Sequence, residues 1–536
     1  MERVLLMLVL AGRLFGAVDG QWTVHSPGTP IEILLELKSD GNRLTGAMSG
    51  PNGTFELLQG RIDSGNVSFE IATHRRDKTT TFRYTGRLNR DSLELTVRSD
   101  DFSGEEHWTA TRREAGKPKP DWFSEVAAPR EVVDWIKAHA IRLASAGPNG
   151  SFDDMAPLAD GLRDAQVVAM GEATHGTREF QQIKFRMLQF LVEKSGFTVF
   201  GIENNWPETL AINDYVLTGK GDGDRLLHNQ FIWWQTEDER EMVRWMRTYN
   251  QDLAHTRKLK FYGFDMQAPQ AAEVNALDYL ERVDPEARAK AAGLFRVIGR
   301  MPENADYEKA PEEVKRRTEE ALGELVQRFD DRKQEYVARS SREQWSFARQ
   351  NLVIVRQAEV KLGNQNDTGS AARDRFMAEN VQWILDHEPA GSRMMVWAHN
   401  GHVAGAGRSE VSPPMGPYLR RIYGGRAVLC GFVFEEGGFR AVDMNTRNLT
   451  DFTVGAPPAG SLDATLAAAG IPLFALDLRN LPEGTVKTWF NAPHVSRQIG
   501  GGYSDSTPGV WLQRIRPAQA FDLLIFVKKT TPIRSI

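Results

Sequence analysis

The spacing of apolar positions divides the chain into regions with different patterns. From about residue 21 to 113, short runs such as Ile31–Leu37 and Val67–Ile71 carry apolar and β-branched residues, and turn sequences such as Asp63–Asn66 separate them. Repeated short strands with such turns between them are typical of antiparallel architectures. We therefore expect a small antiparallel all-β domain, a barrel or a sandwich, over residues 21–113.

A second pattern begins after residues 114–121, where Lys117-Pro118-Lys119-Pro120 indicates a linker. From residue 122 to 536, short apolar strands alternate with helical patterns, which predicts an α/β domain with a mostly parallel sheet and flanking helices. Between residues 285 and 388 the strands disappear, and Glu, Arg, Lys, Gln and Ala recur at helical spacing. We interpret this stretch as a long helical insertion.

The N-terminal residues resemble a targeting segment. A charged tip, Met1-Glu2-Arg3, precedes a short apolar run, Val4–Ala11, which is too short to span a bilayer but suits a signal peptide. We expect a signal peptide over residues 1–20 and export to the periplasm or beyond, with a cytoplasmic protein as the alternative. No other stretch is apolar for about 18 residues, so the sequence predicts no membrane span.

Composition narrows the class of protein. The 536 residues are 41% hydrophobic and 26% charged, and 66 basic against 71 acidic residues give a net charge of −5. This balance does not predict a nucleic-acid-binding surface. A single cysteine, Cys430, excludes a disulfide framework within the chain and a Cys-cluster metal site. The Gly-x-Ser-x-Gly, P-loop and His-Glu-x-x-His signatures are absent.

One segment combines strand ends with ionisable residues. The apolar strand Val167–Met170 is followed by Glu172 and His175, then by a helix, and a second strand ends at Glu203. In a β-α-β unit the two strands are parallel, so these three residues leave the same edge of the sheet, where open α/β sheets bind ligands. The sequence therefore predicts a functional site at this edge.

Two later strands end in the same way. Asp265 follows Phe261–Phe264, and His399 and His402 follow Met394–Trp397. A lone acid or histidine at a strand end is more often a cap or a hydrogen-bond partner. Four strand ends carrying ionisable groups favour one shared site instead.

A lysine marks the helix that follows His175. Lys184 lies within an apolar stripe made by Phe180, Ile183, Met187, Leu188 and Leu191. A buried ammonium needs a partner, so we expect Lys184 to pair with one of the nearby carboxylates. The alternative is that its stem carries the charge out to solvent.

Several longer motifs resemble the erythromycin esterase family. They are residues 171–180 (Gly-Glu-Ala-Thr-His-Gly-Thr-Arg-Glu-Phe), 201–208, 213–217, 261–267 and 398–402. The resemblance extends over about residues 132–532 and leaves out the N-terminal β domain. It implies a hydrolase that opens a lactone with water activated by a histidine, without a metal or other cofactor, and with a possible role in macrolide resistance.

The resemblance also assigns roles residue by residue. The essential histidine of the family falls on His175, its neighbouring acid on Glu172, and the acid of the second strand on Glu203. The late histidine pair falls on His399 and His402. The basic helical position falls on Lys184, where the members that hydrolyse erythromycin have arginine, and this difference bears on macrolide specificity.

We expect a small-molecule ester or lactone as the partner, in contact with Asp265, Asn400, Trp233, Trp234 and Arg178. Ordinary core packing is an equal expectation for the Trp233-Trp234 pair. Three alternatives remain open at this point. The Glu and His residues also suit a metal-dependent hydrolase or an iron- or haem-binding protein, and the domain could be an interaction protein whose site has decayed.

Overall fold

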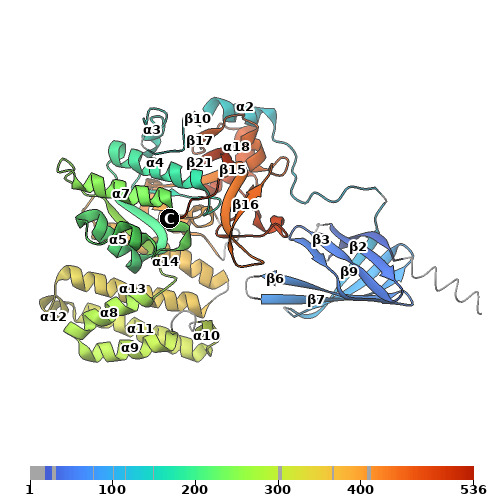
Figure 1. Ribbon diagram of the computed structural model, residues 1–536, viewed down its shortest axis with the longest axis horizontal. Coiled ribbons are helices and arrows are strands. Elements are labelled where there is room, and N and C mark those ends of the chain that lie inside the picture. Colours follow the sequence, from blue (N-terminus) through green and yellow to red (C-terminus); the bar gives the residue numbers. More distant parts are fainter. Residues whose placement is uncertain are drawn as a thin grey trace, which may run out of the picture.

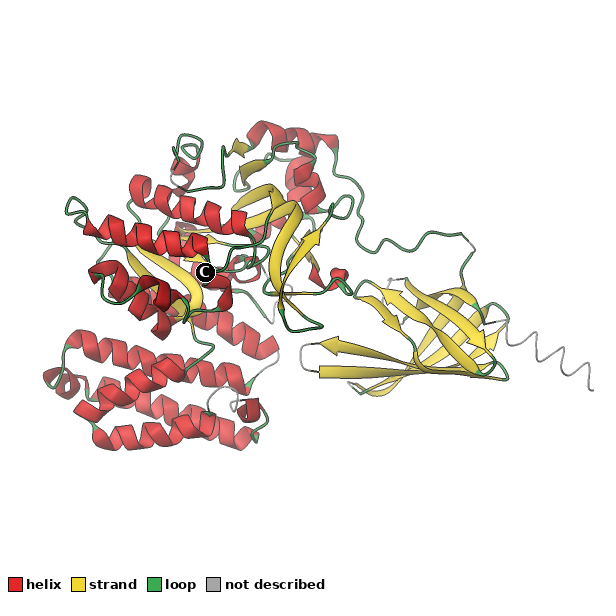
Figure 2. Cartoon of the chain, in the orientation of Figure 1, coloured by secondary structure: helices red, strands yellow, loops and turns green. Residues whose placement is uncertain are grey.

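The computed structural model describes residues 18–26, 32–75, 78–100, 102–114, 116–148, 150–299, 305–364, 367–406 and 412–536. The signal peptide expected over residues 1–20 lies almost entirely outside the described residues. An all-β part, an α/β part and a layer of helices are visible in Figure 1 and, by secondary structure, in Figure 2.

The N-terminal part is a closed antiparallel barrel. Its strands follow the order β2-β1-β9-β8-β7-β6-β5-β3, and pairing of β2 with β3 closes the ring, while β4 extends β3. Apolar side chains such as Trp22, Leu35, Phe69 and Leu95 fill the interior. The barrel alternative of the sequence prediction is therefore the one adopted. The strands are β1 Gly20–His25, β2 Ile33–Asp40, β3 Arg43–Gly50, β4 Gly53–Glu56, β5 Leu58–Asp63, β6 Asn66–Arg75, β7 Lys78–Asn89, β8 Ser92–Ser99 and β9 Phe102–Arg112.

The second part is built on a mixed sheet with the order β10-β17-β21-β15-β11-β14-β12-β13. The pairs from β21 to β13 are parallel, and the antiparallel pairs involve β10, β17 and β16. The mostly parallel α/β sheet predicted from the sequence is confirmed. The strands are β10 Ile141–Arg142, β11 Val167–Met170, β12 Val199–Asn205, β13 Lys260–Asp265, β14 Met394–Trp397, β15 Ala427–Asp443, β16 Leu449–Val454, β17 Leu473–Asp477, β19 Gly502–Tyr503 and β21 Leu523–Thr530; β18 His494–Arg497 and β20 Leu512–Ile515 form a separate pair.

Alternate residues of the central strands face two separate apolar clusters. Val168 and Met170 pack with α4 (Arg178–Ser195) and α7 (Glu237–Gln251). Val167 and Ala169 face the cluster that includes most of the helical layer. Because both faces of the sheet are covered, β11 and β14 at its centre are apolar throughout, as expected of buried parallel strands.

The helices between residues 285 and 388 form the predicted layer below the sheet in Figure 1. They are α9 Pro285–Ile298, α10 Ala305–Glu308, α11 Glu312–Asp331, α12 Lys333–Ala338, α13 Arg342–Gly363 and α14 Asp367–His387. The layer begins one helix earlier than the sequence indicated, because α8 (Gln270–Val283) also packs against α13.

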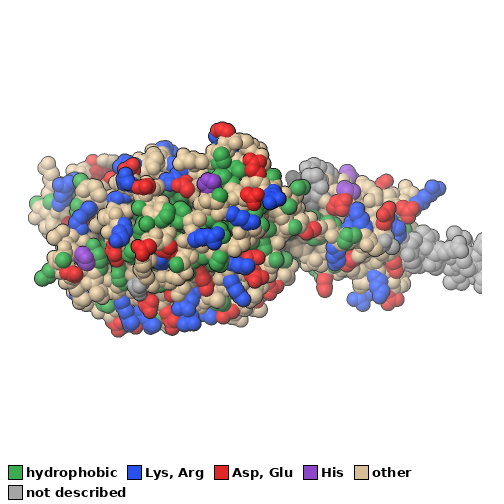
Figure 3. Space-filling model, turned by 90° about the horizontal axis from the view of Figure 1, so that it is seen from above, with side chains coloured by type: hydrophobic (Ala, Val, Ile, Leu, Met, Phe, Trp, Pro, Cys, Tyr) green, Lys and Arg blue, Asp and Glu red, His purple; other side chains and the backbone are tan. Residues whose placement is uncertain are grey.

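The remaining helices complete the α/β part. They are α2 Arg130–His139, α3 Leu158–Leu162, α5 Trp206–Thr218, α6 Gly223–Leu227, α15 Asn400–Val403, α16 Met415–Tyr423, α17 Leu462–Ala467, α18 Thr485–Asn491 and α19 Pro517–Ala520, with 3-10 turns η1 Ile232–Trp234, η2 Gly424–Arg426 and η3 Pro508–Trp511. Among the described residues, none of the helices has the length and apolarity to cross a bilayer. On the face seen in Figure 3, acidic and basic side chains are interspersed.

Candidate active site

The sheet topology brings the predicted strand ends together. β14 lies between β11 and β12, and Met170, Trp397 and Ile202 are in register toward the carboxyl ends of these parallel strands. The expectation that the second strand ends at Glu203 is wrong by two residues, because β12 continues to Asn205 past a register shift against β13. The residues that follow therefore leave one edge of the sheet side by side. His175, after β11, and His399, after β14, have ring centroids 5.3 Å apart.

Glu172 is fully buried at this edge of the sheet and contacts three other side chains of the site. Its Oε1 lies 2.5 Å from Nδ1 of His175, and its Oε2 accepts from Nζ of Lys184 at 2.6 Å and from the indole N–H of Trp397 at 3.0 Å. Because an ionised carboxylate only accepts hydrogen bonds, the proton of a neutral His175 ring sits on Nδ1. Its Nε2 then carries a lone pair, and no hydrogen bond to this nitrogen occurs among the described residues.

Lys184 pairs with Glu172 as expected, and its side chain is fully buried. Burial lowers the pKa of Lys184 to about 8, although the Glu172 carboxylate opposes this shift. The ammonium also lies 4.4 Å from the centroid of the Trp397 ring. Lys184 therefore has no exposed surface, and its charged atom faces Glu172.

Glu203 is held by a different set of donors. Its Oε1 accepts from Nη2 of Arg373 at 2.7 Å, and its Oε2 accepts from the backbone N–H of His399 at 2.9 Å. Burial would raise the pKa of Glu203, but His402 and Arg373 outweigh burial and hold that pKa well below its ordinary range. Arg373 also donates to both oxygens of Asp265, at 3.1 and 2.6 Å.

His402 lies between carboxylates. Its Nδ1 is 2.8 Å from Asp374 and its Nε2 is 3.3 Å from Glu203. Burial opposes protonation, yet these two carboxylates raise the pKa of His402 to about 10. Nη1 of Arg373 lies 2.9 Å from the same Nε2, which is a hydrogen bond only while that nitrogen is unprotonated. When Nε2 is protonated, it can donate to Glu203. When Nε2 is unprotonated, it can accept from Nη1 of Arg373.

His399 is held in the neutral form. Its Nδ1 accepts from the backbone N–H of Gly401 at 3.0 Å, and its Nε2 lies 3.4 Å from the carbonyl oxygen of Ala173. Burial, and then the neighbouring rings of His175 and His402, lower its pKa to about 3. Because Nδ1 accepts, the proton of this ring is on Nε2, where it can be donated.

Two tryptophans border the His175 ring. Trp233 stacks on it at 5.9 Å between centroids, and Trp234 meets it edge-on at 5.7 Å. The indole N–H of Trp234 donates to the carbonyl oxygen of Glu203 at 3.0 Å. Trp234 is buried, whereas Trp233 is only partly buried and provides an apolar surface beside the imidazole.

The other residues expected to contact a substrate have structural partners. Asp265 is fully buried and binds Arg373. Asn400 is buried and exchanges two hydrogen bonds with the backbone of Phe432. Arg178 forms an ion pair with Asp238 at 3.0 Å. Each of these three side chains is therefore already engaged by the protein itself.

Sequence reasoning missed Arg373 and Asp374, which α14 contributes from the helical layer. A signal was present, because Met377, Ala378 and Val381 follow Asp374 at helical spacing and are buried. It also missed Glu239, a buried acid whose two carboxylate oxygens have no hydrogen-bond partner in the described part of the chain.

The donor set bears on the metal alternative. Within the described residues, no group of three or more His, Cys, Asp or Glu side chains is arranged to hold a metal ion. The carboxylates of Glu172 and Glu203 are instead paired with Lys184 and Arg373. A metal ion at this edge would have to displace these cations.

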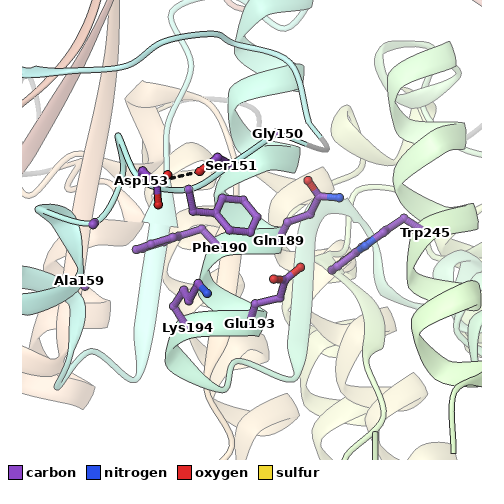
Figure 4. Close-up of a pocket in the computed structure, with 11 residues that line it drawn as sticks. Gly150, Ser151, Asp153, Ala159, Gln189, Phe190, Glu193, Lys194 and Trp245 are labelled. Carbon is purple, nitrogen blue, oxygen red and sulfur yellow. Dashed lines mark hydrogen bonds between the residues drawn. The ribbon is translucent and has the colours of Figure 1, made fainter. Parts of the chain in front are cut away.

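Figure 4 shows a separate cavity of about 560 Å³ at the other end of α4. Phe152, Phe190 and Trp245 provide its aromatic surface, and Glu193 and Lys194 lie at its rim. None of the strand-end acids and histidines lines it. This cavity is therefore not part of the site around His175.

A known protein family matches most of the α/β part. The family model described as erythromycin esterase matches residues 192–530. The chain belongs to the erythromycin esterase family. The matched range begins within α4, so Glu172, His175 and Lys184 precede it, whereas Glu203, Arg373 and both late histidines lie inside it.

Two relatives cover most of this family member. A putative hydrolase, YbfO, of Bacillus subtilis (strain 168) is 25% identical over 72% of this chain and 91% of its own length. Erythromycin esterase type II of Escherichia coli is 24% identical over 65% of this chain and 89% of its own length. Together with the family model, these relatives support a hydrolase of the erythromycin esterase family.

Two solved structures share the fold. A Bacillus cereus protein has 26% identity and a TM-score of 0.68, and the alignment covers 76% of this chain and 98% of that one. An erythromycin esterase mutant in its open conformation has 14% identity and a TM-score of 0.57, with 71% and 95% covered. The latter similarity places the α/β part in the erythromycin esterase fold.

Proposed function

We propose that this protein hydrolyses an ester or lactone with a water molecule activated by His175, without a metal ion. The observation that carries the proposal is the Glu172–His175 contact of 2.5 Å, which directs the lone pair of the ring to Nε2. A neutral imidazole in this arrangement can accept a proton from water at neutral pH.

The remaining groups fit the steps of such a reaction. As water attacks the carbonyl carbon, its proton passes to Nε2 of His175 and the carbonyl oxygen becomes an oxyanion. The N–H on Nε2 of His399, which makes only a long contact of 3.4 Å with the carbonyl oxygen of Ala173, turns from that contact to donate to the oxyanion. When the tetrahedral species collapses, the C–O bond breaks and His175 returns the proton to the leaving alkoxide. Glu172 stabilises the imidazolium between these steps, and Lys184 holds Glu172 in place through their 2.6 Å contact.

The substrate class rests on the walls of the site and on the relatives. The partly buried Trp233 provides an apolar surface next to the reacting centre, with the buried Trp234 behind it, and this surface suits a ring or acyl chain. A macrolide lactone is the substrate suggested by the relative named erythromycin esterase type II. The members that hydrolyse erythromycin have arginine where this chain has Lys184. Lysine is a point charge without the bidentate geometry of arginine, so other lactones should be tested alongside macrolides.

The proposal is tested by a hydrolysis screen over macrolides and simple lactones, read by mass spectrometry as gain of one water. His175→Asn serves as the blank, because asparagine retains a polar side chain but cannot act as the base. We expect turnover by the wild type and a loss of at least about 1000-fold in the variant. Equal turnover by the variant would exclude His175 as the base.

Metal independence requires its own measurement. Protein purified without added metal is analysed for metal content and then assayed after exhaustive chelation. We expect full activity after chelation. A stoichiometric metal whose removal abolishes turnover would contradict the metal-free reaction and favour a metal-dependent hydrolase.

A further inference from the structure

Residues 499–511 of the α/β part contact both the β-barrel and the loop that carries His175. We propose that the barrel is a positioning domain for His175, because its β3–β4 turn, Pro51–Gly53, braces the 499–511 segment against the loop that carries this histidine. The inference rests on the proposed function in treating His175 as the base. The barrel lies outside the stretch that the family model matches.

One end of the 499–511 segment holds the His175 loop directly. The backbone N–H of Ile499 donates to the carbonyl oxygen of Ala173 at 2.6 Å, and the N–H of His175 donates to the carbonyl oxygen of Gly500 at 3.2 Å. A Cβ at Gly501 would lie 3.0 Å from the Trp233 ring, so the backbone passes close to this wall of the site. A displacement of this end would therefore move both His175 and the stacked indole.

The other end meets the barrel in close contact. A Cβ at Gly509 would lie 1.6 Å from the carbonyl oxygen of Pro51 and 2.6 Å from the Phe123 ring. A Cβ at Gly53 would lie 2.9 Å from the carbonyl oxygen of Ser506. Glycine at these positions allows the two backbones to approach, so the β3–β4 turn packs directly on this end of the segment, beside Phe123 of the α/β part.

The part between these ends is packed and hydrogen-bonded. The N–H of Gln498 donates to the carbonyl oxygen of Trp511 at 2.8 Å, which closes the base of the segment. The N–H of Met444 donates to the carbonyl oxygen of Tyr503 at 3.0 Å, and Tyr503 and Ser504 are buried. Because packed interiors are hardly compressible, a shift at Gly509 is passed on toward His175.

The test uses the full chain with Gly509→Ala, which forces the β3–β4 turn away, and Gly455→Ala as the matched control, because a Cβ at Gly455 meets nothing within 4 Å. A second variant, Trp122→Phe, lies outside the 499–511 segment and removes a hydrogen bond of 2.5 Å from the start of the α/β part to the backbone carbonyl oxygen of Glu32, next to β2 of the barrel. Three measurements are made on each variant. The first is hydrogen exchange of residues 173–176 and 499–511. The second is the rate at which diethyl pyrocarbonate acylates His175, and the third is kcat and KM.

We expect Gly509→Ala to increase exchange in both stretches, to change the acylation rate of His175 at least threefold, and to lower kcat at least tenfold with KM nearly unchanged. Trp122→Phe should shift these values in the same direction, and Gly455→Ala should match the wild type. Two results for Gly509→Ala would overturn the proposal. One is an unchanged rate of hydrogen exchange at residues 173–176. The other is faster hydrogen exchange there with an unchanged rate of acylation of His175. Exchange and acylation need no substrate, so they decide this inference even if the hydrolysis screen fails.

Discussion

Replacing Lys184 by methionine probes the buried pair beneath His175. Both side chains of the Lys184–Glu172 pair are fully buried, and their charged atoms are 2.6 Å apart. Removal of one partner leaves a buried charge without compensation, which typically costs about 3–5 kcal/mol of folding free energy. Trp397 still donates to Oε2 of Glu172, so we expect a loss near the lower end, about 3 kcal/mol, from Lys184→Met.

A double-mutant cycle separates this electrostatic cost from lost packing. Glu172→Gln added to Lys184→Met leaves a neutral pair of similar volume, so we expect the double variant to regain at least half of the lost stability. Urea unfolding followed by tryptophan fluorescence measures each variant, and the wild-type slope of the transition checks that the same unit unfolds. A loss below about 1 kcal/mol in Lys184→Met, or no recovery in the double variant, would refute the reasoning.

Other substitutions test the remaining titratable groups. Burial lowers the pKa of Lys184 to about 8, so Lys184 loses its charge above this pH and kcat/KM should decline. Lys184→Arg should keep its activity to higher pH. The same decline of kcat/KM at alkaline pH in both proteins would contradict this. Burial and Glu172 raise the pKa of Glu239 well above its ordinary value. The protonated side chain therefore contributes fully to stability at low pH. As the pH rises from the pKa of Glu239 in the unfolded chain to its pKa in the folded chain, the free energy of unfolding falls by about 1.4 kcal/mol per pH unit. Glu239→Gln should therefore stabilise the protein at pH 7 but not at pH 4, as measured by urea unfolding at both values, and an equal effect at both would count against it. Asp374→Asn should lower the pKa of His402 from about 10 by at least about one pH unit in an NMR titration, because Asp374 contacts Nδ1 at 2.8 Å; an unchanged titration would remove Asp374 as the cause.

The architecture was largely predictable, whereas the order of the strands was not. Alternation and turn residues are local, so they identify the strands of residues 21–113 and the edge at which Glu172 and His175 leave β11. The pairing of β2 with β3, which closes the barrel, is a long-range choice that no local pattern encodes. The same holds for β14, which inserts between β11 and β12 after more than 180 intervening residues of chain.

The site shows how far a charge inside an apolar stripe can guide prediction. Lys184 was identified in this way, and its partner is one of the expected carboxylates. Asp374 sits in an equivalent stripe with Met377 and Ala378, but charged neighbours such as Arg375 and Glu379 give that turn the composition of a solvated helix face. Burial of Asp374 depends on how α14 packs against the sheet edge, which periodicity alone does not determine.

The different environments of Glu172 and Glu203 could only come from the tertiary structure. Both acids lie at or near the carboxyl ends of the two strands that flank β14, so the sequence pattern does not distinguish them. Glu172 meets a ring nitrogen of His175 and a lysine from the helix that follows, whereas Glu203 meets Arg373 from the helical layer and a backbone N–H. Only Glu172 can therefore orient the proposed base, and Glu203 instead joins the strand edge to the helical layer. A substitution of Glu203 should consequently disturb His399 and His402 before it disturbs His175.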